Sequence, residues 1–136
     1  MPKKILIVDD DPDIILFLST VLKDNGYQTI NAMNGREGLE MIESEHPDLI
    51  LLDLMMPKKS GLSLLSDLKR DSVNRQIPVI MVTGVSSETG HDLASFFKGN
   101  TAGNEECKAI IPEGYLEKPI DPEKLLGMVK GLLKPD

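Results

Sequence analysis

The sequence predicts an α/β fold in which helices cover both faces of a doubly wound parallel sheet. Short apolar runs alternate along the chain with longer stretches whose apolar residues recur at helical spacing. Apart from the run at residues 27–32, the apolar runs are not interrupted by polar residues, which is typical of strands buried on both faces. Helices between such strands predict right-handed crossovers that keep the strands parallel.

Five apolar runs are the expected strands of this sheet. They cover residues 4–8, 27–32, 49–52, 79–82 and, with a weaker signal, 115–116. The stretch between the fourth and fifth runs is the least regular part of the chain, and its glycine- and asparagine-containing residues 99–104 favour a loop. We therefore expect an irregular insertion within about residues 86–114, before the last strand.

Two helices have clear start signals. The first begins at Asp11, whose side chain can cap free backbone N–H groups, and at Pro12, which suits the first helical position. Its inward face is expected to carry Ile14, Leu18, Val21 and Leu22, and Gly26 is expected to end it. Asp121 and Pro122 open the last helix in the same way. Two further helices are predicted around residues 36–45 and 62–71 from their apolar spacing.

Length and composition limit the class of protein. With 136 residues, 40% apolar and 27% charged, we expect one domain over residues 1–136 and no separate output domain. A net charge of −7 disfavours direct binding to nucleic acid, which needs clustered cations. No apolar run approaches the roughly 20 residues that span a bilayer. A single cysteine, Cys107, fits a reducing compartment, so we expect a cytoplasmic protein.

Polar residues follow four of the apolar runs, at the carboxyl ends of the predicted strands, where open parallel sheets bind their ligands. Asp9 and Asp10 follow the first run, Asp53 the third, Thr83 and Gly84 the fourth, and Lys118 comes shortly after the fifth. Three carboxylates at one edge repel one another unless a cation lies among them. Oxygen ligands with room for water favour Mg²⁺, which also binds phosphate oxygens.

These residue types suit phosphoryl transfer to a carboxylate. An aspartate beside Mg²⁺ can attack a phosphoryl group and form an acyl phosphate. Lys118 would supply a positive charge to one phosphate oxygen, and the Thr83 hydroxyl would donate a hydrogen bond to another. Gly84 leaves space for the phosphoryl group.

Four motifs, in order along nearly the whole chain, resemble the receiver domains of two-component response regulators, the CheY-like family. The motifs are Ile-Leu-Ile-Val-Asp-Asp at 5–10, the segment 47–61 around Asp53, Pro-Val-Ile-Met-Val-Thr-Gly at 78–84 and Tyr-Leu-Glu-Lys-Pro at 115–119. The resemblance implies a flavodoxin-like fold with Asp53 as the phosphoacceptor. It also implies the following site: Mg²⁺ bound by Asp10, Asp53 and the carbonyl of Met55, with Asp9 assisting through water, and Thr83 and Tyr115 as the switch pair.

The function that this resemblance implies is a signalling switch rather than an enzyme. The chain would receive a phosphoryl group from a sensor histidine kinase or a phosphotransfer protein, lose it slowly, and signal to another protein by changing conformation.

Two other functions remain open from the residues. Asp9 and Asp11 have the Asp-x-Asp spacing of a small phosphohydrolase of the haloacid dehalogenase type, with Asp9 as its nucleophile. Pro12 speaks against this reading because it places Asp11 at a helix start, and Asp53 would then have no role. The other alternative is a pseudo-receiver, a protein-binding scaffold that is never phosphorylated.

Overall fold

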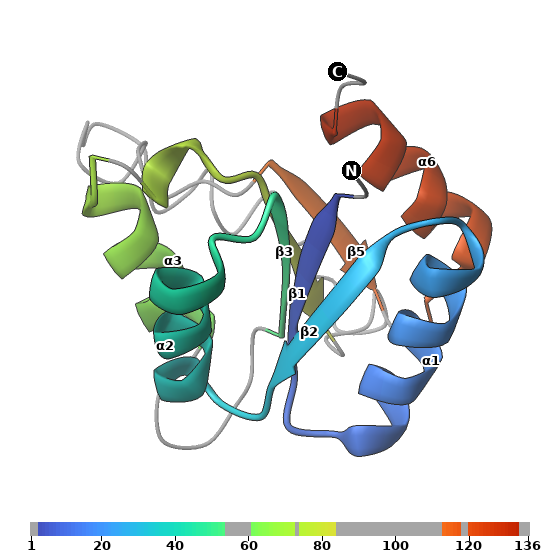
Figure 1. Cartoon of the computed structure of the whole chain (residues 1–136), viewed down its shortest axis with the longest axis horizontal. Helices are drawn as coiled ribbons and strands as arrows, with labels where there is room; N and C mark the ends of the chain where they lie inside the picture. The colour runs from blue at the N-terminus through green and yellow to red at the C-terminus, as the bar shows by residue number, and fades with distance from the viewer. Residues whose placement is uncertain (1–2, 54–60, 73, 84–112, 118–119, 134–136) are drawn as a thin grey trace, which may run out of the picture.

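The computed structural model describes residues 3–53, 61–72, 74–83, 113–117 and 120–133. Five strands, all parallel, form one sheet in the order β2-β1-β3-β4-β5 (Figure 1). They are β1 (Lys4–Val8), β2 (Gln28–Ala32), β3 (Leu49–Asp53), β4 (Val79–Thr83) and β5 (Gly114–Glu117). The predicted five-stranded parallel sheet is confirmed.

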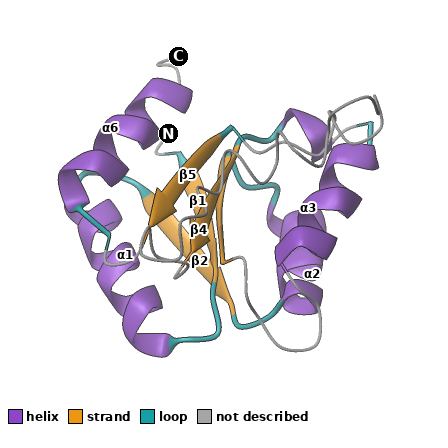
Figure 2. Ribbon diagram, turned by 180° about the vertical axis from the view of Figure 1, so that it is seen from behind, coloured by secondary structure: helices purple, strands orange, loops and turns teal. Residues whose placement is uncertain are grey.

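Helices cover both faces of this sheet, as predicted for a doubly wound fold. The described helices are α1 (Pro12–Asp24), α2 (Gly35–Glu45), α3 (Gly61–Arg70) and α6 (Pro122–Leu132), with a short 3-10 helix η1 (Asn74–Gln76) before β4. Helices α1 and α6 lie on one face of the sheet, and α2 and α3 lie on the other (Figures 1 and 2). No helix in the described part of the chain is both long and apolar enough to cross a membrane.

The core has two layers because successive strand side chains point to opposite faces. Leu6 and Val8 of β1 belong to the cluster beneath α2 and α3, whereas Ile5 and Ile7 belong to the cluster beneath α1 and α6. All four side chains are at most 1% exposed. The continuous apolar run therefore reflects a strand buried on both faces.

The helix boundaries follow the local start and stop signals. The Asp11 side chain accepts a hydrogen bond from the Asp13 N–H at 2.9 Å, and Asp121 accepts one from the Glu123 N–H at the same distance. Both carboxylates therefore cap their helices, as predicted. After α1, Gly26 has a φ of 91°, in the region that favours glycine.

The inward face of α1 differs from the sequence prediction. On α1 the deeply buried side chains are Ile15, Leu18 and Leu22, while the expected Ile14 and Val21 are only partly buried. Helix α1 packs over β1 and β2, and this contact, rather than local apolar spacing alone, selects its inward face.

Strand β5 begins at Gly114, at the end of the range assigned to the irregular insertion. Of that predicted insertion, residues 86–112 lie outside the described residues. Its last two residues are described: Gly114 is the first residue of β5, and Glu113 directly precedes it and donates its N–H to the Val79 carbonyl.

Candidate metal centre

The candidate site forms where β1 and β3 end side by side. Val8 pairs with Leu52 in the sheet, so the residues that follow them, Asp9 and Asp53, come to the same edge. Asp53 is the last residue of β3, and Asp9 directly follows β1. Their neighbourhood is a result of the parallel register between two strands that are 44 residues apart along the chain.

Backbone hydrogen bonds fix the position of Asp9. Its N–H donates to the carbonyl of Ala32 at 3.1 Å, which extends the pairing of β1 with β2 by one residue. Its Oδ1 accepts the N–H of Asp11 at 2.9 Å. Asp9 is 1% exposed and Asp53 is 4% exposed, whereas Asp10 is exposed. The site thus has two buried carboxylates and a third that faces solvent.

Asp9, Asp10 and Asp53 each offer a carboxylate oxygen within 4.8 Å of the others. Two like charges at 4.8 Å repel by about 3.5 kcal/mol at an effective dielectric constant of about 20. A cation bound among the three carboxylates would offset this repulsion.

The donor set fits Mg²⁺. Its octahedral ligands lie about 2.1 Å from the ion, so opposite oxygens are about 4.2 Å apart. The three oxygens, all within 4.8 Å of one another, are therefore near enough for one ion to bind them with small side-chain adjustments. All three ligands are carboxylate oxygens, which hard divalent cations prefer. The exposed position of Asp10 leaves the solvent side open for water or a phosphate oxygen.

The other predicted site residues are only partly described. Thr83 ends β4, where it pairs with Glu117 of β5, and the preceding Val82 pairs with Asp53. The backbone of Thr83 therefore lies at the same sheet edge as the carboxylates. Tyr115 pairs with Met81, is half-buried and packs against the core cluster beneath α2 and α3. Met55, Gly84 and Lys118 lie outside the described residues.

One buried charged residue of the described chain has no part in the predicted site. Lys69, on α3, is 8% exposed and binds Glu113, which directly precedes β5. The sequence contains no signal for this pair, because Lys69 occupies a position where a solvent-facing lysine is usual and its partner is 44 residues away.

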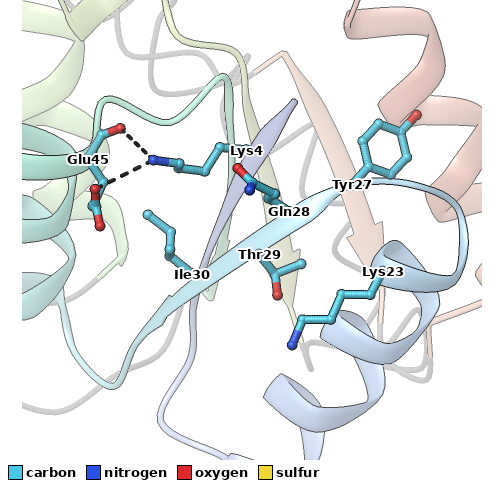
Figure 3. A pocket seen from close by; sticks show the side chains of 7 residues that line it. All are labelled: Lys4, Lys23, Tyr27, Gln28, Thr29, Ile30 and Glu45. Carbon is cyan, nitrogen blue, oxygen red and sulfur yellow. Dashed lines mark hydrogen bonds and ion pairs between the residues drawn. The ribbon is translucent and has the colours of Figure 1, made fainter. Parts of the chain in front are cut away.

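A hollow at the opposite end of the sheet is a separate feature (Figure 3). It lies beside the edge strand β2 and is lined by Lys4, Lys23, Tyr27, Gln28, Thr29, Ile30 and Glu45. Lys4 and Glu45 form an exposed ion pair at 3.5 Å across it. The hollow is near the amino ends of the strands, away from the carboxylate cluster.

The strand order and the carboxylate cluster together define a class of protein. The strand order is that of flavodoxin-like folds, which bind phosphate-containing ligands at the carboxyl edge of the sheet. The model of the response regulator receiver domain matches residues 5–130, and this chain belongs to that family.

Curated relatives agree with this assignment. The phosphate regulon transcriptional regulatory protein PhoB of Escherichia coli (strain K12) is 31% identical over 134 residues, which are 98% of this chain and 53% of PhoB. The DNA-binding dual master transcriptional regulator RpaA of Synechocystis is 36% identical over 134 residues, which are 98% of this chain and 50% of RpaA. The chain thus spans about half the length of these relatives.

Solved structures match the chain over nearly their whole length. The chemotaxis protein CheY4 of Vibrio cholerae has a TM-score of 0.78 and 29% identity, with 98% of this chain and 100% of CheY4 covered. A CheY-like response regulator receiver domain protein of Methanospirillum hungatei has a TM-score of 0.78 and 31% identity, with coverage of 96% and 93%. The predicted CheY-like fold is confirmed.

Proposed function

We propose that this receiver domain accepts a phosphoryl group on Asp53 and acts as a signalling switch. The observation that carries the proposal is the carboxylate cluster: Asp53, Asp9 and Asp10 meet at the carboxyl edge of a sheet with the receiver strand order. Asp53 is the central member, because β3 lies between β1 and β4 in the sheet. It therefore has the other two carboxylates on its β1 side and the predicted phosphate-binding residues of β4 and of the segment after β5 on its other side.

The three carboxylates would hold Mg²⁺, together with the backbone carbonyl of Met55 that the family resemblance implies. When bound, the ion supplies positive charge that offsets the carboxylate repulsion and neutralises phosphate oxygens. Asp9 would keep the arrangement rigid, since its Oδ1 is held by the Asp11 N–H.

In the transfer step, an Asp53 carboxylate oxygen attacks the phosphorus of a phosphohistidine on a sensor kinase or phosphotransfer protein. A P–O bond forms, the P–N bond breaks, and its electron pair returns to the imidazole, which takes up a proton from solvent. Lys118 and the Thr83 hydroxyl would bind the phosphate oxygens, and Gly84 would leave room for them. After this transfer, the only further step is slow hydrolysis of the acyl phosphate.

The readout would pass through Thr83 and Tyr115. A phosphoryl group on Asp53 that attracts the Thr83 hydroxyl favours one of two conformations of the domain, and Tyr115 on the adjacent strand follows. The downstream partner would be a protein. Several relatives are transcriptional regulators by name, but this chain covers about half of each, and its net charge of −7 disfavours contact with DNA by these residues.

The test is labelling with acetyl phosphate or beryllofluoride in the presence of Mg²⁺, followed by mapping of the adduct. We expect an adduct on Asp53 that requires Mg²⁺ and disappears in Asp53→Asn. An adduct on Asp9 would support the phosphohydrolase instead. A chain that takes no adduct while it remains folded would support the pseudo-receiver scaffold.

A further inference from the structure

Lys69 is a buried charge that the proposed chemistry does not use. Its side chain is 6% exposed, and its Nζ donates to Glu113 Oε1 at 2.5 Å and to the carbonyl of Arg75 in η1 at 3.3 Å. An isolated buried ammonium is very costly, so these acceptors are needed for the folded state. The side chain thereby joins α3, η1 and the residue that precedes β5.

Glu113 holds the first residue of β4 at two points. Its N–H donates to the carbonyl of Val79 at 2.9 Å, and its Oε2 accepts the N–H of Val79 at 2.7 Å. The carboxylate therefore takes the place of a backbone carbonyl at the start of the β4–β5 ladder. With Oε1 bound by Lys69, both carboxylate oxygens are engaged.

The register of β5 against β4 begins at this contact, and it determines which residues lie at the carboxyl end of β5. Strand β5 has four residues and pairs with β4 alone, at the edge of the sheet. Tyr115 faces the core cluster beneath α2 and α3, and Leu116 faces the opposite cluster. A slip of one residue would exchange these faces. It would also shift Glu117 away from Thr83, its partner in the sheet.

We propose that Lys69 and Glu113 are positioning residues for the phosphoryl site, forming a latch that fixes the register of β5 against β4. Lys118 directly follows Glu117 in the sequence, so the register set at Glu113 fixes the point on the sheet edge from which the chain continues to Lys118. Glu117, the last residue of β5, is four residues beyond Glu113, about 13 Å along an extended strand. This inference rests on the proposed function, because it assigns the latch to the phosphate-binding residues of that site.

The latch predicts that phosphoryl-analogue binding and metal binding respond differently when it is broken. The carboxylates that would hold Mg²⁺ follow β1 and β3, which the latch does not touch. The residues that would bind the phosphoryl group come from β4 and the end of β5. If Lys69 and Glu113 only stabilised the fold, breaking their contact would change the affinities for Mg²⁺ and for the phosphoryl analogue together.

The experiment uses Lys69→Met, Glu113→Gln and the double variant in the full chain. The control is Lys4→Met, which breaks another ion pair at the same end of the sheet, between β1 and α2, with side chains 29% and 42% exposed. Three quantities are measured under conditions where every variant is folded: amide hydrogen exchange in β5 relative to β3, Mg²⁺ affinity by calorimetry, and beryllofluoride affinity by fluorine NMR.

For Lys69→Met we expect about tenfold faster exchange in β5 and about tenfold weaker beryllofluoride binding, with Mg²⁺ affinity unchanged. The double variant should lose no more than either single variant, since the pair acts as a unit. Lys4→Met should stay within about twofold of the unmodified chain in all three measurements.

Unchanged beryllofluoride affinity in Lys69→Met and Glu113→Gln would overturn the proposal and leave the pair a purely structural contact. An equal fall in Mg²⁺ affinity would overturn it as well, because the effect would then be general. If the unmodified chain itself bound no beryllofluoride, the proposed function would fail. The exchange rates of β5 would still show whether the latch sets the register, so the two failures are distinguishable.

Discussion

Met128 of α6 lies directly over Gly114, the first residue of β5. A Cβ atom at position 114 would be 2.5 Å from the Met128 Sδ and 3.3 Å from its Cγ. Glycine at this point therefore allows α6 to pack against the edge strand. By contrast, a Cβ atom at Gly127, the neighbour of Met128 in α6, would meet nothing within 4 Å.

Gly114→Ala should lower the free energy of unfolding by about 1–3 kcal/mol, because the added methyl group displaces Met128 from its contact. Urea unfolding measures the change. Gly127→Ala is the matched control and should raise stability by about 0.5–1 kcal/mol through helix propensity alone. The double variant Gly114→Ala, Met128→Ala should recover part of the loss. Equal stabilities of the two single variants would show that the close approach is absent.

Gly38→Ala should also destabilise the protein. A Cβ atom there would lie 3.1 Å from Leu64 Cδ2 and 3.2 Å from Val8 Cγ2. These side chains are 0% and 1% exposed, so neither can move into solvent. We expect a net loss of about 1–2 kcal/mol despite the gain in helix propensity. Gly131→Ala, in open space on α6, is the control. A Gly38→Ala variant as stable as this control would contradict the packing of α2 described above.

Asp53→Asn should stabilise the protein in the absence of divalent cations. The change removes one charge from the buried cluster, and about 1–3 kcal/mol of repulsion should be relieved. The unmodified chain should gain about 2.7 kcal/mol from Mg²⁺ at 100 times its dissociation constant, and the variant should gain little. Unfolding in EDTA and in Mg²⁺ measures both effects.

Asp24→Asn removes the same charge from an exposed position at the far end of α1 and serves as the control. It should respond to Mg²⁺ like the unmodified chain. If Asp53→Asn were less stable than this control in EDTA, the three carboxylates would not repel one another as their distances imply.

Asp11→Ala should cost about 1 kcal/mol of unfolding free energy through the loss of the α1 cap, without reducing acetyl phosphate labelling of Asp53. Asp121→Ala removes the equivalent cap of α6, also followed by proline, and should cost a similar amount. In a phosphohydrolase with an Asp9-x-Asp11 site, only the first variant would lose activity. A selective loss of labelling in Asp11→Ala would therefore count against the receiver chemistry.

The strands and helix starts were predictable because their signals are local. The run at residues 5–8 is continuous and apolar, and it is buried on both faces in the sheet. Asp11-Pro12 and Asp121-Pro122 start helices for reasons contained in two adjacent residues. The exact inward face of α1 was less predictable, because Ile14 and Ile15 are equally apolar and only the packing distinguishes them.

The candidate site could be predicted to a similar extent. Asp9, Asp10 and Asp53 follow buried strands, and parallel strands bring their carboxyl ends to one edge, so their meeting follows from the pattern. The latch could not be predicted in this way. Lys69 and Glu113 are each ordinary charged residues in sequence, and only the order of α3, β4 and β5 places them together.

The sequence by itself thus determined the parallel α/β architecture and the carboxylates at its edge, because apolar periodicity and capping act over a few residues. Only the tertiary structure decided that α1 and α6 share one face, that Met128 covers Gly114, and that Lys69 meets Glu113. These contacts join residues 14 and 44 positions apart, and their energies depend on close packing and burial that no local pattern encodes.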